Sequence, residues 1–97
     1  MENSIVAFSE RMQSKLDKNK FKECAAMNPD GMGRDWGRCS LYWLLFRLRE
    51  ETLELEQALR ADDFENAMDE AADVGNFAMM IHDNLKNKYF QTDSRNR

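Results

Sequence analysis

The stretch from Arg47 to Asp73, RLREETLELEQALRADDFENAMDEAAD, contains the pattern that decides the fold. Apolar residues recur every three or four positions on both sides of Ala61-Asp62-Asp63, a spacing typical of amphipathic helices. Asp62 or Asp63 can cap the helix that follows, because a short acidic side chain accepts hydrogen bonds from the first free backbone N–H groups. The stretch therefore predicts two helices joined by a tight turn.

The whole chain is predicted to be all-α, with three main helices and no strand. Ser4 is expected to cap a first helix that ends at about Asn19. Ser40 is expected to cap a second helix over residues 41–60, and the third helix is expected over residues 64–88. These helices should pack as an antiparallel bundle.

Residues 23–39 form the one predicted long loop. Asn28-Pro29-Asp30-Gly31 is a strong turn signal within it, and long loops in small domains are often functional. Trp36 lies in this loop, where its ring can either fill the core or stack on the base of a ligand. The sequence leaves both roles open.

The size of the chain, 97 residues, indicates one domain. We assign residues 1–90 to a single helical domain and residues 91–97 to a polar C-terminal tail. A domain this small buries a modest share of its surface, so self-association is expected.

Composition and charge exclude several classes of function. The net charge is −4 with no cluster of Lys or Arg, so long nucleic acid is not an expected partner. No apolar stretch is long enough to cross a membrane, and the first residues lack the features of a signal peptide. Cys24 and Cys39 are predicted to be free thiols in a reducing cytoplasm, because a single His cannot complete a zinc site with them.

Five carboxylates in the opening stretch fall on helix faces that also carry large apolar residues. They are Glu50, Glu51, Glu54, Glu70 and Asp73. On a helical wheel at about 100° per residue, the three acids of the second helix lie opposite its solvated sector, which holds Arg49, Glu56 and Arg60. The acids are therefore predicted to be partly buried, where an unpaired charge is costly.

A divalent cation is the simplest way to neutralise these acids. Glu51 and Glu54 are three residues apart, as are Glu70 and Asp73, so each pair lies on one helix face one turn apart. Two facing pairs would form a cage of four carboxylates, and such hard oxygen ligands favour Mg²⁺ or Mn²⁺ over zinc. The alternative is an acidic face closed by salt bridges to a partner subunit.

The same acids carry a resemblance to a known family. Glu50-Glu51-Thr52-Leu53-Glu54 and Glu70-Ala71-Ala72-Asp73 form the pattern EExxE…ExxD, which resembles the signature of the MazG-like all-α nucleoside triphosphate pyrophosphohydrolases. The flanking residues resemble the dATP/dGTP branch, which includes the phage MazZ-like enzymes, over about residues 8–85. The insertion from Glu23 to Asp35, ahead of Trp36, departs from that branch and leaves the base preference open.

The resemblance implies a reaction and roles for the acids. Glu51, Glu54, Glu70 and Asp73 would hold Mg²⁺, with Mn²⁺ as a substitute, against the triphosphate. A water molecule would attack at the α/β phosphoanhydride and release a nucleoside monophosphate and pyrophosphate. Glu50 would orient or deprotonate that water. Its alternative role is a salt bridge to Arg47 or to a lysine.

The resemblance also implies a set of residues that contact the substrate. Arg47 would clamp phosphate oxygens, Asn76 would hydrogen-bond the sugar or a phosphate, and Met80 would touch the base. Lys18 and Asn19 would meet the base or the phosphates, unless they form only a solvated helix end. Trp36 would stack on the base if it does not fill the core.

The expected function is therefore metal-dependent hydrolysis of (deoxy)nucleoside triphosphates, with dGTP and dATP as the first substrates to test. Small members of this family close the open side of three helices by forming dimers or tetramers, and the same is expected here. The compartment would be the cytoplasm, or the host cytoplasm if the protein is viral. The alternative is a non-catalytic helical interaction module that binds a partner through its acidic face. The sequence does not decide among pool cleansing, phage genome modification and stress control.

Overall fold

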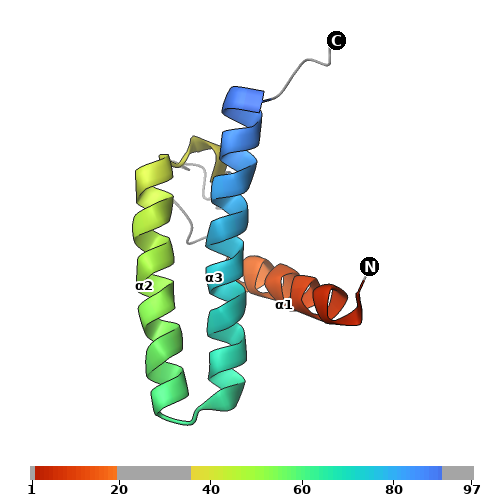
Figure 1. Ribbon diagram of the computed structural model, residues 1–97, viewed down its shortest axis with the longest axis vertical. Coiled ribbons are helices and arrows are strands. Elements are labelled where there is room, and N and C mark those ends of the chain that lie inside the picture. The colour runs from red at the N-terminus through yellow and green to blue at the C-terminus, as the bar shows by residue number, and fades with distance from the viewer. Residues whose placement is uncertain (1, 20–35, 91–97) are drawn as a thin grey trace.

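The computed structural model describes residues 2–19 and 36–90, which form helices joined by short connections and contain no strand. The helices are α1 (Asn3–Asn19), a short 3₁₀ helix η2 (Trp36–Arg38), α2 (Leu41–Arg60), α3 (Phe64–Leu85) and a π-helical turn η3 (Lys86–Phe90). The all-α prediction with three main helices is confirmed for these residues (Figure 1).

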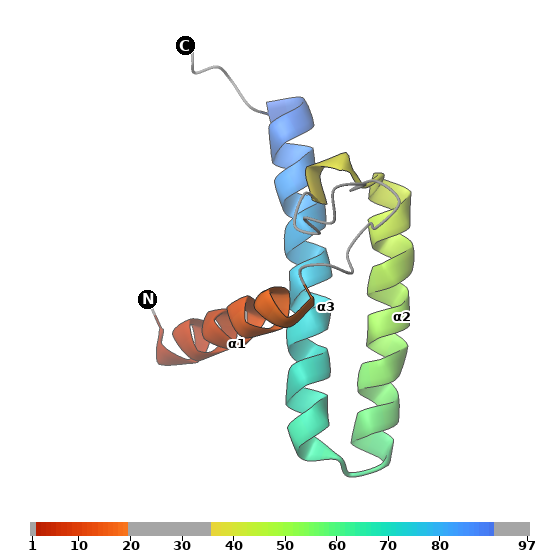
Figure 2. The same cartoon turned by 180° about the vertical axis from the view of Figure 1, so that it is seen from behind.

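The hairpin of α2 and α3 is the main body of the fold, with the two helices side by side and antiparallel (Figures 1 and 2). Ser40 caps α2, because its hydroxyl accepts a hydrogen bond from the backbone N–H of Trp43 at 2.9 Å. Asp63 caps α3 through the N–H of Asn66 at 3.4 Å. Asp62 has a φ of 56°, a left-handed conformation that a short polar residue tolerates in the turn. Both predicted caps on the hairpin are confirmed.

Two predicted helix ends differ from the structure. Ser4 lies inside α1, which begins at Asn3, and the N–H groups of Ile5 and Val6 both bond to the carbonyl of Glu2 at 3.1 Å. The backbone of Glu2 therefore starts the helix, and a hydroxyl cap at Ser4 is wrong. The third helix is predicted to end at Lys88. In the structure α3 ends three residues earlier, at Leu85, and the chain continues as the π-helical turn η3.

The core lies under η2, between the first half of α2 and the second half of α3. Its buried members are Cys39, Leu44, Phe77 and Met80. Trp36 packs against them, and its indole N–H donates to the Asp83 carboxylate at 2.9 Å. Asn84, 2% exposed, donates to the carbonyls of Trp36 at 3.0 Å and Cys39 at 3.3 Å. The predicted loop therefore ends in an ordered 3₁₀ turn, while residues 20–35 lie outside the described part.

Cys39 is 1% exposed and is disulfide-bonded. The prediction of a free thiol is therefore wrong at Cys39, because separation along the chain does not report which sulfur atoms meet in space. Its bonding partner lies outside the described residues. The expectation of a reducing cytoplasm rested on free thiols, so that argument no longer supports the compartment.

Helix α1 crosses α3 near its middle and projects away from the hairpin (Figure 2). Two contacts fix this crossing: the Asn76 amide donates to the carbonyl of Met12 at 3.0 Å, and Arg11 pairs with Asp69 at 2.6 Å. A Cβ on Gly75 would lie 2.8 Å from the ring of Phe8, so the glycine permits the close approach. The crossing places the second half of α1 against the acids of α3.

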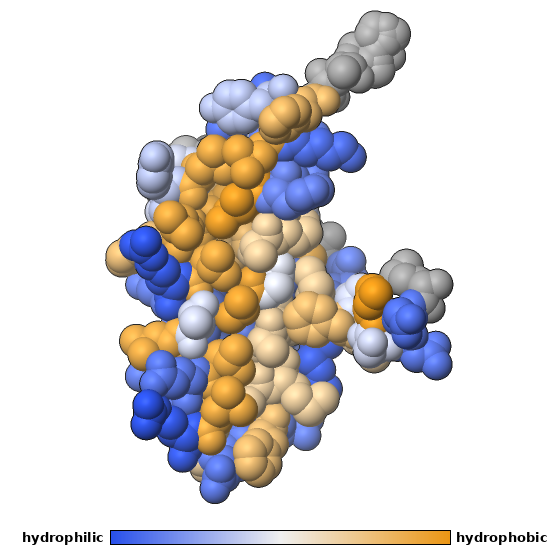
Figure 3. Space-filling model, viewed as in Figure 1, coloured by the Kyte–Doolittle hydropathy of each residue, from blue (hydrophilic) through white to orange (hydrophobic). Residues whose placement is uncertain are grey.

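Much apolar surface is exposed on this single chain. Figure 3 shows an apolar band along the hairpin. Large apolar residues that are at least half exposed include Ile5, Phe46, Leu53, Leu59, Phe64 and Met68. Contiguous apolar patches on soluble chains often mark interaction surfaces. Among the helices of the described residues, none has the length and apolar character needed to cross a membrane.

Candidate metal centre

Three of the four predicted metal ligands meet between α2 and α3. Glu51 comes from α2, and Glu70 and Asp73 come from successive turns of α3. One carboxylate oxygen from each lies within 4.8 Å of the others. The antiparallel hairpin produces this arrangement, because it brings the middle of α2 opposite the first half of α3.

Glu54, the fourth predicted ligand, lies beside this group on its exposed side. Its proximity to Glu70 contributes to the raised pKa of that residue. Its charge also contributes to raising the pKa values of Glu51, Glu70 and Asp73. Glu54 is therefore close enough to act with the three acids, while remaining open to solvent.

Glu51 is buried with an incomplete set of partners. It is 5% exposed, and its Oε2 accepts from Arg47 at 3.1 Å. Its Oε1, and Oε1 of Glu70, are buried without a hydrogen-bond partner in the described structure. A buried carboxylate oxygen without a partner is costly, so these two oxygens need a proton or a cation beside them, which the oxygens of a solvated acidic face would not.

The electrostatics of the three acids agree with their burial. Burial, followed by the charge of Glu54, raises the pKa of Glu51 from 4.5 to about 7. Burial also raises the pKa values of Glu70 and Asp73. Near neutral pH the group therefore retains protons more readily than ordinary carboxylates do, and a divalent cation would displace them.

Arg47 is the cationic residue that α2 places beside the acids. Its guanidinium donates to Glu50 at 2.5 Å and to Glu51 at 3.1 Å, and its central carbon lies 4.9 Å from the centre of the Phe77 ring. Glu50 is thus in the salt bridge that the sequence offered as its alternative role. A role for Glu50 with the attacking water, and for Arg47 with phosphate, stays a prediction.

Lys15 is the cation that sequence reasoning missed. Its Nζ lies 3.4 Å from Oδ2 of Asp73, and the two side chains are 18% and 16% exposed. The substrate contacts predicted for this end of α1 concern Lys18 and Asn19, and no contact with the acids was predicted for Lys15. The available signal was position, since Lys15 follows Met12 by three residues and so shares its apolar face.

Of the other predicted substrate-binding residues, Asn76 lies one turn after Asp73 on α3, while Trp36 and Met80 lie in or against the core. Asn76 is 3% exposed and holds the backbone of α1, although its Oδ1 has no partner in the described structure. Met80 is 1% exposed in the core. Trp36 bonds to Asp83, which is about 15 Å from Asp73 along α3 at 1.5 Å per residue. As the chain stands, Trp36 and Met80 contribute to the core.

Lys18 and Asn19 lie at the end of α1. Lys18 is exposed in the last turn. Asn19 is the last residue of the helix, and its side chain lies outside what the structure describes. A contact of either residue with substrate stays a prediction.

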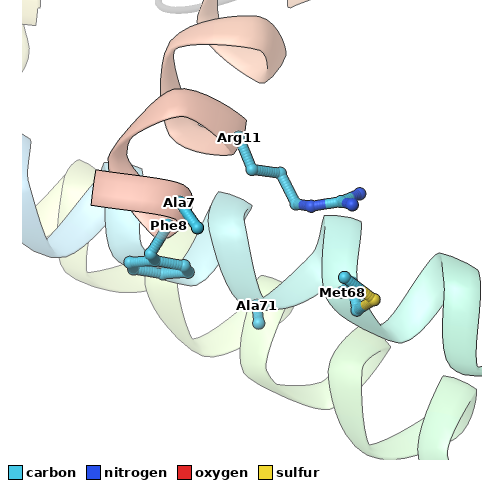
Figure 4. Close-up of a pocket in the computed structure, with 5 residues that line it drawn as sticks. All are labelled: Ala7, Phe8, Arg11, Met68 and Ala71. Atoms are coloured by element: carbon cyan, nitrogen blue, oxygen red, sulfur yellow. The ribbon is translucent and has the colours of Figure 1, made fainter. Parts of the chain in front are cut away.

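An apolar pocket of about 290 Å³ lies where α1 crosses α3 (Figure 4). It is lined by Ala7, Phe8, Arg11, Met68 and Ala71. On the wheel of α3, Met68 and Ala71 are about 140° and 160° from Asp73, so the pocket opens away from the acids. It is therefore not a base pocket for a substrate held at the carboxylates.

Comparison with known proteins leaves the family open. No family model matches the chain, and no solved structure matches it. An uncharacterized protein from Archaeoglobus fulgidus is 42% identical to it over 60 residues. That similarity covers 62% of this chain and 64% of the relative, so the chain spans less than two thirds of the relative's length.

Proposed function

We propose that the chain is a metal-dependent nucleoside triphosphate pyrophosphohydrolase. The observation that carries this proposal is the orphaned Oε1 of Glu51, which is buried within a group of three carboxylates from two helices. The resemblance of EExxE…ExxD to the MazG-like enzymes supports the reaction class. The proposed products are a nucleoside monophosphate and pyrophosphate, with dGTP and dATP as the first candidate substrates.

The donor set fits Mg²⁺ or Mn²⁺. All three side chains offer carboxylate oxygens, and Mg²⁺ sites in proteins commonly use few carboxylates together with water and substrate phosphates. Glu51, Glu70 and Asp73 would hold the ion, and Glu54 would complete the set from the exposed side. When bound, such an ion withdraws charge from phosphoryl oxygens and makes a nearby water more acidic.

The residues around the acids supply the remaining steps. Arg47 has a planar guanidinium that suits phosphate oxygens, and it now bridges Glu50 and Glu51. If Arg47 turns to a phosphate, Glu50 loses its partner and becomes available to take a proton from the attacking water. Glu54, exposed beside the ligands, is the second carboxylate within reach of that role.

A homodimer or homotetramer is part of the proposal. The exposed apolar side chains of α2 and α3 give a second copy a surface to cover. The same surface would also serve the alternative, a non-catalytic module whose acids pair with a partner. Enzyme and module differ in turnover, because only the enzyme releases pyrophosphate.

The test is to incubate the protein with each dNTP and NTP in the presence of Mg²⁺ and to measure pyrophosphate. The wild-type chain should release it from at least one nucleotide, and Glu51→Gln should not. Glu56→Gln is the matched control, since it makes the same change on an exposed turn of the same helix. Absence of release from every nucleotide would contradict the enzyme and favour the interaction module.

A further inference from the structure

Lys15 brings a positive charge from α1 to the acids of the hairpin. Its Nζ is 3.4 Å from Oδ2 of Asp73, and both side chains are largely buried. Asp73 is one of the three carboxylates that converge. A cation at this oxygen competes with a metal ion for the same negative charge.

The ammonium can leave Asp73 without disturbing the helix that carries it. The backbone of α1 is held separately, by the Asn76 amide on the carbonyl of Met12 and by the ion pair of Arg11 with Asp69. A lysine side chain is a point charge on a flexible stem of four carbons, so its charge can move while its Cα stays in place.

A metal ion at Asp73 would leave this ammonium beside a second cation. That arrangement is unfavourable at short range unless an anion arrives between the charges. A phosphate chain that reaches the metal supplies such an anion, and it offers acceptor oxygens for the ammonium. Metal and phosphate should therefore bind together more readily than the metal binds alone.

We propose that Lys15 is a triphosphate-binding residue that holds Asp73 in the metal-free protein and transfers its ammonium to a phosphate oxygen when metal and substrate bind. This inference rests on the proposed function. It assigns α1 a direct contact with substrate at Lys15. It also predicts that one substitution changes the two affinities in opposite directions.

The test uses Mn²⁺ alone and Mn²⁺ premixed with inorganic tripolyphosphate, with binding measured by calorimetry on the full chain. Lys15→Met should tighten Mn²⁺ binding by about threefold or more, because the competing charge is removed. It should weaken binding of the Mn²⁺–tripolyphosphate complex by about tenfold or more, because a charge-assisted hydrogen bond is lost. Lys88→Met, an equal change of charge at an exposed site in η3, should alter neither affinity.

A second variant protects the test against misfolding. Lys15→Gln also removes the charge but can still hydrogen-bond Asp73, so it should fold and show both shifts. If either variant weakens Mn²⁺ and tripolyphosphate binding alike, Lys15 only supports the structure and the inference is overturned. Unchanged affinities in both variants would overturn it as well.

This experiment separates the inference from the proposed function. If the wild-type chain hydrolyses no nucleotide but the two affinities shift in opposite directions, the reaction is wrong and the role of Lys15 stands. If hydrolysis is seen while Lys15→Gln keeps the wild-type KM and Mn²⁺ affinity, the reaction stands and the role of Lys15 is wrong.

Discussion

Two arginine–glutamate pairs on α2 show how position decides what an ion pair can do. Arg60 meets Glu56 at 2.8 Å, and their side chains are 77% and 54% exposed. Arg47 meets Glu51 at 3.1 Å, and their side chains are 29% and 7% exposed. The shorter pair is the one that solvent screens, so distance alone does not identify the important contact.

The difference comes from what packs against each turn of the helix. The turn of Glu51 faces the acids of α3, so its carboxylate is desolvated and surrounded by like charge. The turn of Glu56 faces solvent, where charges of either sign are tolerated. The same residue type, glutamate, is therefore a candidate metal ligand on one turn of α2 and an ordinary surface residue on another.

The largest expected effect is on Glu51. Glu51→Gln removes a ligand charge while keeping the shape of the side chain, and it should lower nucleotide hydrolysis by about a thousandfold, or about 4 kcal/mol in the barrier. Saturating Mn²⁺ should stabilise the wild-type chain by about 2–3 kcal/mol at a hundredfold excess over Kd, and most of this should disappear in the variant. Thermal melts with and without Mn²⁺ measure the second effect.

Glu56→Gln is the control for this comparison. It should keep both the hydrolysis rate and the stabilisation by Mn²⁺. If the two variants respond to Mn²⁺ alike, the convergence of the three carboxylates does not reflect a metal site.

Stability should also depend on pH through Glu51. Folding raises the pKa of Glu51 from 4.5 to about 7. Below about pH 4.5 the acid is protonated in both states and does not oppose folding. Stability is lost as the pH rises from about 4.5 to about 7, because only the unfolded chain can then release the proton freely. The upper limit of this loss is about 3 kcal/mol at 1.36 kcal/mol per pKa unit. Glu70 and Asp73 act in the same direction, because their pKa values are also raised.

Urea unfolding from pH 5 to pH 8 measures this dependence. The free energy of unfolding of the wild type, minus that of Glu51→Gln, should fall as the pH rises. Mg²⁺ should restore the stability of the wild-type chain at pH 8. A difference that stays flat or rises with pH would show that Glu51 is not held as a desolvated acid.

The helices and the acids were predictable because their signals are local. Ser40, Asp63 and the apolar spacing of α2 and α3 act within one or two turns, and the structure bears these out. The convergence of Glu51 with Glu70 and Asp73 followed from the same spacing, because two antiparallel helices with facing acids leave few other arrangements.

What the sequence missed depends on contacts between distant segments. Lys15 reaches Asp73 only because Asn76 and Gly75 set where α1 crosses α3, and no periodicity within α1 encodes that crossing. The bond at Cys39 likewise depends on which segments meet in space. Trp36 was left open between core and ligand, and its bond to Asp83 places it at the core.

Arg47 provides the next comparison. Arg47→Met removes the partner of a buried carboxylate, so it should destabilise the metal-free chain by about 1–3 kcal/mol at pH 8. This is less than the cost of breaking a fully buried pair, because Arg47 is partly exposed. The loss should shrink toward pH 5, where Glu51 is protonated and no longer needs a counter-charge. Urea midpoints at the two pH values measure both effects.

The smallest effect is expected from Arg60→Met, the same change made thirteen residues further along α2. Its partner Glu56 is solvated, so loss of the pair should cost no more than about 0.5 kcal/mol. The cost should fall further in 1 M salt, since exposed charges are screened, whereas the cost of Arg47→Met should persist. Equal costs for the two variants at pH 8, or equal sensitivity to salt, would mean that α3 does not desolvate the Arg47 turn. The difference between the two turns of α2 would then be one of geometry without energetic consequence.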